Sequence, residues 1–188
     1  ETKSYTVNKD EGPRADTSLE ALAKLRPVFA ADGSVTAGTS SQMSDGAAFV
    51  LIMSEELVKE LNLTPIARLV NYASAGVEPR IMGIGPVEAT NKALSKAGLT
   101  LADMDIIELN EAFAAQALAC TRAWGIADDD PRLNPNGGSI AIGHPLGVTG
   151  ARIAYSAALE LQLTQKRYAL ITMCIGVGQG YAAIIERV

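Results

Sequence analysis

Three short stretches of the sequence carry side chains whose types suit chemistry. His144, the only histidine, lies in a glycine-rich stretch just ahead of a predicted helix, whose N-terminal amides can stabilise negative charge. Cys174 ends an apolar run and precedes glycines at every second position, which can aim backbone N–H groups at an anion. Asn110 follows a short apolar run, and ligands collect at strand ends in α/β sheets. Should these loops converge, a base, a thiol, an amide and N–H donors would suit acyl transfer through a carbanion or an oxyanion.

Each of these side chains also has a purely structural interpretation. Cys174 could be an inert core residue, because cysteine is often buried, and its glycines could simply make a tight turn. Asn110 could be a helix N-cap, with Glu111 as a favourable charge in the first turn of that helix. His144 could be a hydrogen-bonded loop residue, although the entropic cost of so many glycines is hard to explain for a surface loop.

The elements that would position these loops alternate between strands and helices. The stretch 45–54 is a continuous apolar run of strand length, which indicates a strand buried on both faces. Ser54 is expected to cap the next helix, and Gly98 to end a later one. The order predicts an α/β fold with a mixed β-sheet layered with helices and a C-terminal hairpin. Helices are predicted within 17–29, 55–62, 87–98, 111–125 and about 148–163, and strands over 45–54, 66–75 and 104–110, with two more within 168–188.

Composition argues against several classes of function. The net charge is −5 and Lys and Arg are scattered, so no basic stripe is available for nucleic acid. The apolar runs are far shorter than the roughly 20 residues that span a bilayer, so no membrane span is expected. Cys120 and Cys174 lack a CxxC pattern, which predicts free thiols rather than a disulfide or a zinc site. We expect an intracellular globular protein, and the polar, turn-rich start at Glu1 indicates a piece of something longer.

Five stretches together resemble the thiolase family. They are "NEAFA" at 110–114, "GGSIAIGHPLGVTGAR" at 137–152, "CIGVGQG" at 174–180, "GSVTAGTSSQMSDGAA" at 33–48 and "MGIGP" at 82–86. The motifs are long, and the resemblance runs across nearly the whole chain. The variant "TSSQMSDGA", with "DEGPRADTSLEALAKLRPVF" before it, is most similar to degradative 3-ketoacyl-CoA thiolases, or acetyl-CoA acyltransferases.

The resemblance implies a thiolase-like fold and a thiolytic Claisen cleavage. Thiolases cleave a 3-ketoacyl-CoA with CoA to acetyl-CoA and a shortened acyl-CoA, as in fatty acid β-oxidation, and some run the reverse condensation. His144 would then activate a nucleophilic cysteine and donate to the thioester oxygen, while Cys174 would exchange a proton with the α-carbon of acetyl-CoA. Asn110 would hold the water that completes the first oxyanion hole, and the N–H of Gly176 would contribute to the second.

The substrate contacts are implied in the same way. Ser41 matches a serine that contacts the pantetheine arm of CoA, and Met82 and Phe113 match positions that line the acyl pocket. The expected partners are therefore acyl-CoA and CoA, with CoA acting as a substrate. No metal or redox cofactor is implied. The full-length parent is expected to be a homo-oligomer, either a dimer or a tetramer.

One part of the family pattern has no counterpart in this sequence. The acyl-accepting cysteine lies in the N-terminal half of thiolases, and Cys120 does not replace it because it lies in an alanine-rich predicted helix. The resemblance divides the chain into the end of an inserted loop region (1–37), the last strand and helix of the N-terminal domain (38–65), and the C-terminal domain (66–188). We therefore expect a C-terminal fragment that is inactive alone.

Two alternatives remain open at this point. The chain could be a non-catalytic acyl-CoA-binding or assembly subunit on a thiolase scaffold. A condensing enzyme of the wider superfamily is less favoured, because those enzymes use two histidines or a His/Asn pair. The expected location is cytoplasmic for a bacterial protein, and mitochondrial or peroxisomal otherwise.

Overall fold

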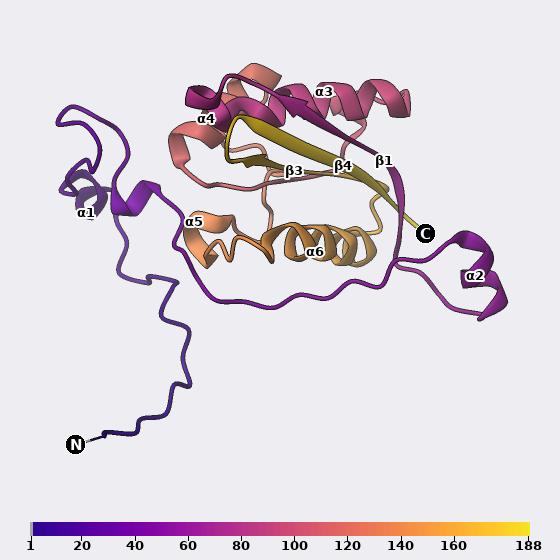
Figure 1. Ribbon diagram of the computed structural model, residues 1–188, viewed down its shortest axis with the longest axis horizontal. Helices are drawn as coiled ribbons and strands as arrows, with labels where there is room; N and C mark the ends of the chain where they lie inside the picture. The colour runs from indigo at the N-terminus through magenta and orange to yellow at the C-terminus, as the bar shows by residue number, and fades with distance from the viewer. Residues whose placement is uncertain (1) are drawn as a thin grey trace.

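A mixed four-stranded sheet lies at the centre of the computed structural model, which describes residues 2–188 (Figure 1). The strand order is β1-β4-β3-β2. Strands β2 and β3 run parallel, whereas β3 and β4 form an antiparallel hairpin and β4 pairs antiparallel with β1. This confirms the predicted α/β fold with a mixed sheet. The strands are β1 (Ala67–Gly76), β2 (Ile106–Leu109), β3 (Tyr168–Ile175) and β4 (Gln179–Arg187).

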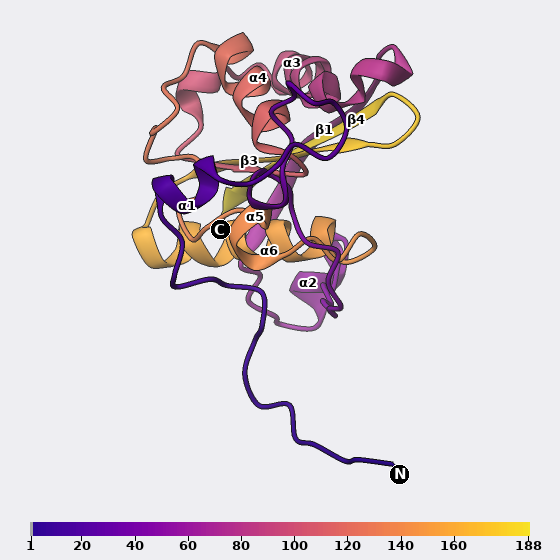
Figure 2. The same ribbon diagram turned by 90° about the vertical axis from the view of Figure 1, so that its left-hand side faces the viewer.

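Helices cover both faces of this sheet. Helices α3 (Gly85–Ala97) and α4 (Ala114–Trp124) lie on one face, and α5 (Ser139–Ile142) and α6 (Thr149–Thr164) lie on the other (Figures 1 and 2). Within residues 2–188, no helix is long and apolar enough to cross a membrane. The remaining elements are α1 (Leu19–Ala23), α2 (Glu55–Glu60), and the 3₁₀ helices η1 (Ala37–Thr39), η2 (Pro79–Ile84) and η3 (Leu101–Asp103).

Alternate residues of β2 pack into hydrophobic clusters on the two faces of the sheet. Ile107 packs in the core under α3, whereas Ile106 packs against α6. Helix α6 offers apolar residues at a spacing of four, Ile153, Ala157 and Leu161, which form one stripe facing the sheet. Because side chains alternate along a strand, Glu108 and Asn110 follow Ile106 onto the α6 side.

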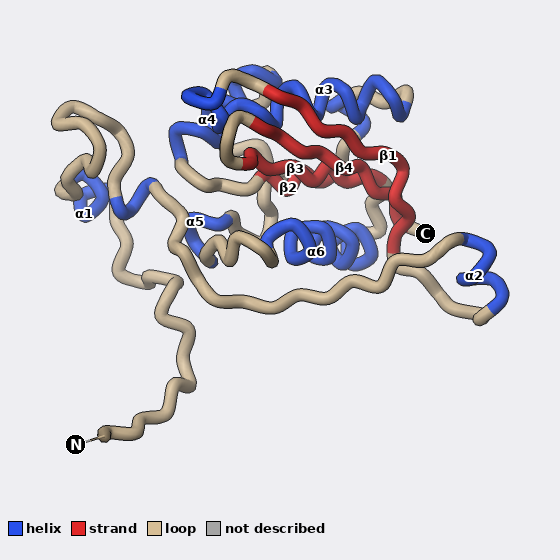
Figure 3. The backbone as a smooth tube through the Cα atoms, in the orientation of Figure 1, coloured by secondary structure: helices blue, strands red, loops and turns tan. Residues whose placement is uncertain are grey.

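The parallel pair β2–β3 brings two of the predicted site residues to one edge of the sheet (Figure 3). Leu109 is the partner of Thr172 in the parallel register. Asn110 therefore stands one residue beyond this pair on its strand, and Cys174 two residues beyond it on the neighbouring strand. The carboxyl ends of parallel strands are where α/β proteins place their binding sites.

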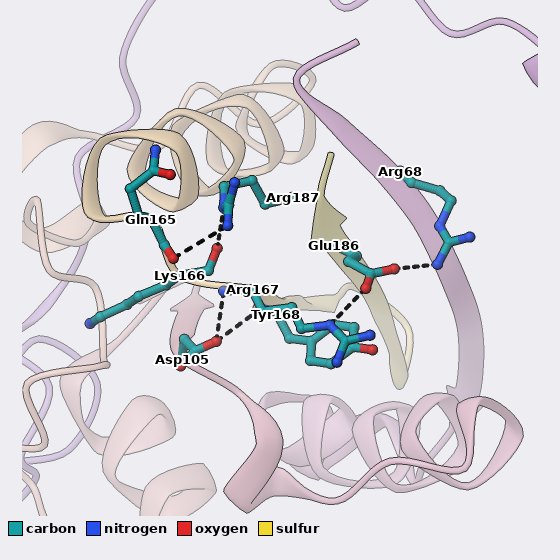
Figure 4. A network of polar contacts seen from close by, with 8 residues as sticks. All are labelled: Arg68, Asp105, Gln165, Lys166, Arg167, Tyr168, Glu186 and Arg187. Carbon is teal, nitrogen blue, oxygen red and sulfur yellow. Dashed lines mark hydrogen bonds and ion pairs between the residues drawn. The ribbon is translucent and has the colours of Figure 1, made fainter.

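A network of ion pairs and hydrogen bonds joins the strands at the end of the sheet that lies away from Asn110 and Cys174 (Figure 4). Glu186 of β4 pairs with Arg68 of β1 and with Arg167, whose Nε lies 2.8 Å from Oε1 of Glu186. The hydrogen bond from Arg167, supported by Arg68, holds the pKa of Glu186 below its usual range. Asp105 accepts the backbone N–H groups of Arg167 and Tyr168 at 2.9 and 3.0 Å. These contacts fix where β2 and β3 begin, and hence the register in which they end at the site.

Short-range signals predicted several helix ends correctly. The Ser54 side chain accepts the backbone N–H of Leu57, and so it caps α2. Gly98 follows α3 with a φ of 66°, in the left-handed region that glycine favours. The helices predicted within 17–29 and 111–125 are shorter than expected, because α1 covers only Leu19–Ala23 and α4 begins at Ala114.

The strand predicted over 45–54 is wrong. This segment is extended, but it pairs with no strand among residues 2–188 and runs along the outside of α5 and α6 (Figure 1). Phe49, Leu51 and Ile52 are 94%, 83% and 80% exposed. The apolar pattern correctly indicates a need for burial, but a β-ladder requires a neighbouring strand, and none is available in this part of the chain.

Candidate active site

The loop that carries His144 is held from two sides. Its backbone N–H donates to the carbonyl of Gln42 at 2.8 Å, which ties it to the segment before residue 45. Its ring atom Nδ1 lies 2.7 Å from Oγ1 of Thr149, the first residue of α6. Thr149 is fully buried, and its hydroxyl donates to the carbonyl oxygen of Pro145 at 3.1 Å.

These contacts assign the tautomer of His144. The carbonyl of Pro145 can only accept, so the single hydroxyl proton of Thr149 is used there. The hydroxyl therefore accepts from His144, whose Nδ1 must carry the ring proton. The other ring nitrogen, Nε2, then has a free lone pair, which is what a general base requires.

Asn110 lies directly against this lone pair. Its Nδ2 is 3.3 Å from Nε2 of His144, and its Oδ1 is 2.5 Å from the hydroxyl of Ser139. The backbone N–H of Asn110 donates to Thr172 of β3 at 3.0 Å, and the residue is only 1% exposed. The N-cap interpretation of Asn110 is wrong, because α4 begins at Ala114 with Phe113 in the cap position.

Glu111 joins this loop to the histidine loop. Its carboxylate accepts from Nδ2 of Asn134 at 3.0 Å and from the backbone N–H of Ile140 at 3.3 Å. A Cβ at Gly138 would stand 2.1 Å from the carboxyl carbon of Glu111, so a larger residue there would displace this carboxylate. The interpretation of Glu111 as a first-turn charge of α4 is therefore wrong, and it instead clamps the two motifs together.

Cys174 lies opposite Gly180 in the β3–β4 hairpin. It is partly buried, and burial raises the pKa of its thiol, which keeps the proton on sulfur at neutral pH. Gly180 packs directly on Gly85, because a Cβ there would be 2.1 Å from its carbonyl carbon. The "CIGVGQG" and "MGIGP" stretches are therefore in contact.

The other cysteine is part of the core. Cys120 is fully buried in α4, and its thiol donates to the carbonyl of Gly83 at 3.4 Å. Burial raises the pKa of Cys120 to about 11. Such a thiol is inert as a nucleophile at neutral pH.

The remaining predicted site residues lie on three segments around this edge. Ser41 donates from both its backbone N–H and its hydroxyl to the carbonyl of Ala112, at 3.0 and 3.2 Å. The neighbouring Ser40 forms a single β-bridge with Phe113. Met82 lies in η2 and Gly176 in the β3–β4 turn. Among the described residues, neither of these last two hydrogen-bonds to His144 or Asn110.

Burial also controls the charge of the histidine. Burial, and secondly the positive charge of Arg152, lowers the pKa of His144, so the ring is neutral at pH 7. Glu108 lies two residues before Asn110 on the same face of β2 and is 4% exposed. Burial raises the pKa of Glu108 to about 7, and the nearby Arg152 opposes this rise only in part.

Comparison with known proteins gives this arrangement a family. The chain matches the model of the thiolase N-terminal domain over residues 1–56 and the model of the thiolase C-terminal domain over residues 63–187. The chain belongs to the thiolase family. The β-ketoadipyl-CoA thiolase of Acinetobacter baylyi is 58% identical to it over 182 residues, which are 97% of this chain and 45% of that thiolase.

Solved thiolase structures share its fold. The crystal structure of the Bacillus anthracis acetyl-CoA acetyltransferase matches with a TM-score of 0.92 and 47% identity, over 96% of this chain and 45% of that one. The human mitochondrial 3-ketoacyl-CoA thiolase in complex with CoA matches with a TM-score of 0.89 and 48% identity, over 98% of this chain and 46% of that one. The resemblance drawn from the motifs is thus confirmed, and this thiolase chain spans less than half the length of these relatives.

A cavity of about 540 Å³ opens beside the histidine loop of this thiolase chain. Its wall includes Gly143 and Pro145, on either side of His144, together with Ser44 and Arg152. The hydroxyl of Ser44 is buried and has no hydrogen-bond partner among the described residues. The cavity wall therefore includes both sequence neighbours of His144 and one buried hydroxyl without a partner among the described residues.

Sequence reasoning missed three residues of this site. Thr149 and Arg152 lie inside the "GGSIAIGHPLGVTGAR" motif, and Ser139 is its third residue. Thr149 and Arg152 are three residues apart on α6, a spacing that places side chains on one face of a helix, which was an available signal. No pattern in the sequence indicates that Ser139 reaches Asn110, because that contact spans 29 residues.

Proposed function

We propose that this chain is the C-terminal part of a thiolase that cleaves a 3-ketoacyl-CoA with CoA. The observation that carries the proposal is the pair formed by Asn110 and His144, with the imidazole held neutral and its Nε2 lone pair unprotonated. A neutral imidazole is equipped to remove a proton from a thiol. The partly buried thiol of Cys174 at the same edge of the sheet supplies the second acid/base group.

The proposed reaction uses each group in turn. His144 takes the proton of a nucleophilic cysteine that the rest of the parent protein contributes, and the resulting thiolate attacks the 3-keto carbon of the substrate. The bond between C2 and C3 then breaks, leaving an acyl thioester on that cysteine and the enolate of acetyl-CoA. The thiol of Cys174 protonates C2, which releases acetyl-CoA.

The second half-reaction restores both sulfur atoms. The thiolate of Cys174 takes the proton of incoming CoA, whose sulfur attacks the acyl thioester. The shortened acyl-CoA leaves, and His144 returns its proton to the nucleophilic cysteine. Asn110 would hold a water that, with His144, forms the first oxyanion hole around the thioester oxygen, which carries the enolate charge. The N–H of Gly176 would contribute to the second oxyanion hole. Losing one such donor typically costs about 100- to 1000-fold in kcat.

We further propose the division of the chain that the motifs indicate. Residues 1–37 would end an inserted loop region, 38–65 would be the last strand and helix of the N-terminal domain, and 66–188 the C-terminal domain. The exposed apolar segment 45–54 supports this division, since such a segment requires strands on either side. Ser41, Met82 and Phe113 would line the path of the pantetheine arm and the acyl chain.

The same site must also select the acyl group of the substrate, for which there are two candidates. The motifs favour the 3-ketoacyl-CoA substrates of fatty acid β-oxidation, whereas the name of the Acinetobacter relative favours β-ketoadipyl-CoA. Relative values of kcat/KM for acetoacetyl-CoA, a longer 3-ketoacyl-CoA and β-ketoadipyl-CoA would separate these possibilities. The highest value identifies the substrate class.

The test of the proposal is functional complementation. The chain is assayed for thiolysis alone and after mixing with the separately expressed N-terminal half of the Acinetobacter thiolase. We expect activity only in the mixture, and its loss when the mixture contains His144→Ala or Cys174→Ser. Binding of CoA with no activity in the mixture would instead support a non-catalytic acyl-CoA-binding subunit.

A further inference from the structure

Beyond His144 and Asn110, a row of hydrogen-bonded side chains runs back through buried Ser139 to half-buried Arg152 on helix α6. Nη2 of Arg152 is 3.1 Å from the hydroxyl of Ser139, which is 2.5 Å from Oδ1 of Asn110. Nδ2 of Asn110 then reaches Nε2 of His144. Ser139 and Asn110 are each 1% exposed, so water does not compete for these contacts. We refer to Arg152, Ser139 and Asn110 as the amide relay.

The chemistry of the relay fixes its direction. A guanidinium has donors only, so the hydroxyl of Ser139 accepts from Arg152 and must give its own proton to another atom. The carbonyl oxygen of the Asn110 amide is that acceptor. The amide is therefore oriented with its NH₂ group toward His144, and in the resting state this orientation favours an unprotonated Nε2.

The opposite amide orientation would reverse the properties of the histidine. If the amide of Asn110 turned over, its oxygen would face Nε2 and would favour the tautomer protonated there. Its NH₂ group would then face Ser139, whose hydroxyl proton would have no acceptor in the relay. A histidine protonated on Nε2 cannot take a proton from a thiol through that atom.

We infer that Ser139 and Arg152 are positioning residues that orient the amide of Asn110 and thereby keep Nε2 of His144 unprotonated in the resting state. The inference rests on the proposed function for its consequence in catalysis, but not for its structural content. Helix α6 holds both ends of the system, because Thr149 accepts from Nδ1 and Arg152, three residues later, begins the relay. Burial lowers the pKa of Arg152, and the nearby carboxyl groups of Glu108 and Glu111 oppose this shift.

The test uses the fact that His144 is the only histidine of the chain. The ¹⁵N chemical shifts of its two ring nitrogens report the ratio of the two neutral tautomers. Because no other histidine contributes signals, these signals need not be assigned to a residue. They are measured above pH 7 for the wild-type chain, for Ser139→Ala and for Arg152→Met. Ser95→Ala, on the exposed side of α3, is the matched control.

We expect the wild-type chain to hold mainly the tautomer protonated on Nδ1. In Ser139→Ala the ratio should fall about five-fold, the factor that corresponds to the net contribution of one hydrogen bond. Arg152→Met should lower the tautomer ratio in the same way, because it removes the donor to the hydroxyl of Ser139. The inference can therefore be tested even if one of the two variants fails to fold. Equal ratios in Ser139→Ala, Arg152→Met and Ser95→Ala would overturn the inference.

A kinetic readout separates this inference from the proposed function. In the complemented enzyme, Ser139→Ala should lower kcat while leaving KM unchanged, because the hydroxyl contacts Asn110 and not the substrate. A complemented enzyme with no thiolysis at all would refute the proposed function while the tautomer ratios would still decide the role of the relay. A change in KM alone would show that Ser139 acts on substrate binding, and would count against the inference.

Discussion

The substitution Glu108→Gln offers a quantitative test of the electrostatics beneath the site. Glu108 is 4% exposed, and burial raises the pKa of its carboxyl group from 4.5 to about 7. The folded chain therefore keeps a proton between these two pH values that the unfolded chain has lost. The free energy of unfolding must fall as the pH rises through this window, because the folded state binds the proton more tightly.

Glutamine has nearly the same shape as glutamic acid and does not titrate, so it removes this pH dependence. A pKa rise of this size corresponds to about 3 kcal/mol of lost stability once the pH exceeds 7. The variant should therefore be more stable than the wild type by under about 1 kcal/mol at pH 5, rising to about 3 kcal/mol at pH 8. Losing the negative charge beside Arg152 opposes part of this gain, so the increase with pH is the decisive quantity.

Urea unfolding followed by the fluorescence of Trp124, the single tryptophan, provides the assay. Both proteins are measured between pH 5 and pH 8.5, and the difference in the free energy of unfolding is plotted against pH. Glu88→Gln is the matched control, because Glu88 lies on the exposed side of α3 and the same substitution there replaces a carboxyl group that is not buried. A difference between Glu108→Gln and wild type that stays constant or falls with pH would refute the reasoning.

Two further predictions concern the loops around the site. Gly138→Ala should lower the free energy of unfolding by about 1–3 kcal/mol, because the new methyl group displaces the carboxylate of Glu111. The control is Gly147→Ala, where an added Cβ meets nothing within 4 Å and the melting temperature should change little. Equal melting temperatures for the two variants would contradict the role of Glu111 in joining the two loops. Arg152→Met should raise the pKa of His144, because the substitution removes a positive charge that disfavours the imidazolium. An NMR titration of the single histidine measures this pKa. An unchanged or lower pKa in the variant would count against this account.

The parts of the fold that depend on nearest neighbours in the chain were predictable from the sequence. The caps at Ser54 and Gly98 follow from contacts within one helical turn, and the strand–helix alternation follows from apolar periodicity. The stretch 45–54 could not be predicted in the same way. Its apolar composition indicates that the segment needs burial, but it does not indicate which strands would cover the segment. In this chain the segment is extended and exposed.

Some candidate residues of the site could be chosen from the sequence, but the contacts between them could not. His144 and Cys174 stand out by residue type and by the glycines around them, and Asn110 stands out by its place at a strand end. The parallel pair β2–β3 places Asn110 and Cys174 at one edge. Their hydrogen bonds join segments tens of residues apart, such as Asn110 with His144 at a separation of 34 residues. Because such pairs depend on how α6 packs on the sheet, the roles of Ser139 and Arg152 emerge only from the three-dimensional arrangement.

The central claim is that this chain supplies the base and the second thiol of a thiolase. The most direct measurement is the rate of 3-ketoacyl-CoA thiolysis after mixing the chain with the N-terminal half of the Acinetobacter relative. The account predicts activity in the wild-type mixture and its loss with either His144→Ala or Cys174→Ser. Equal rates for the wild-type and His144→Ala mixtures, or no thiolysis in a mixture shown to have assembled, would contradict it.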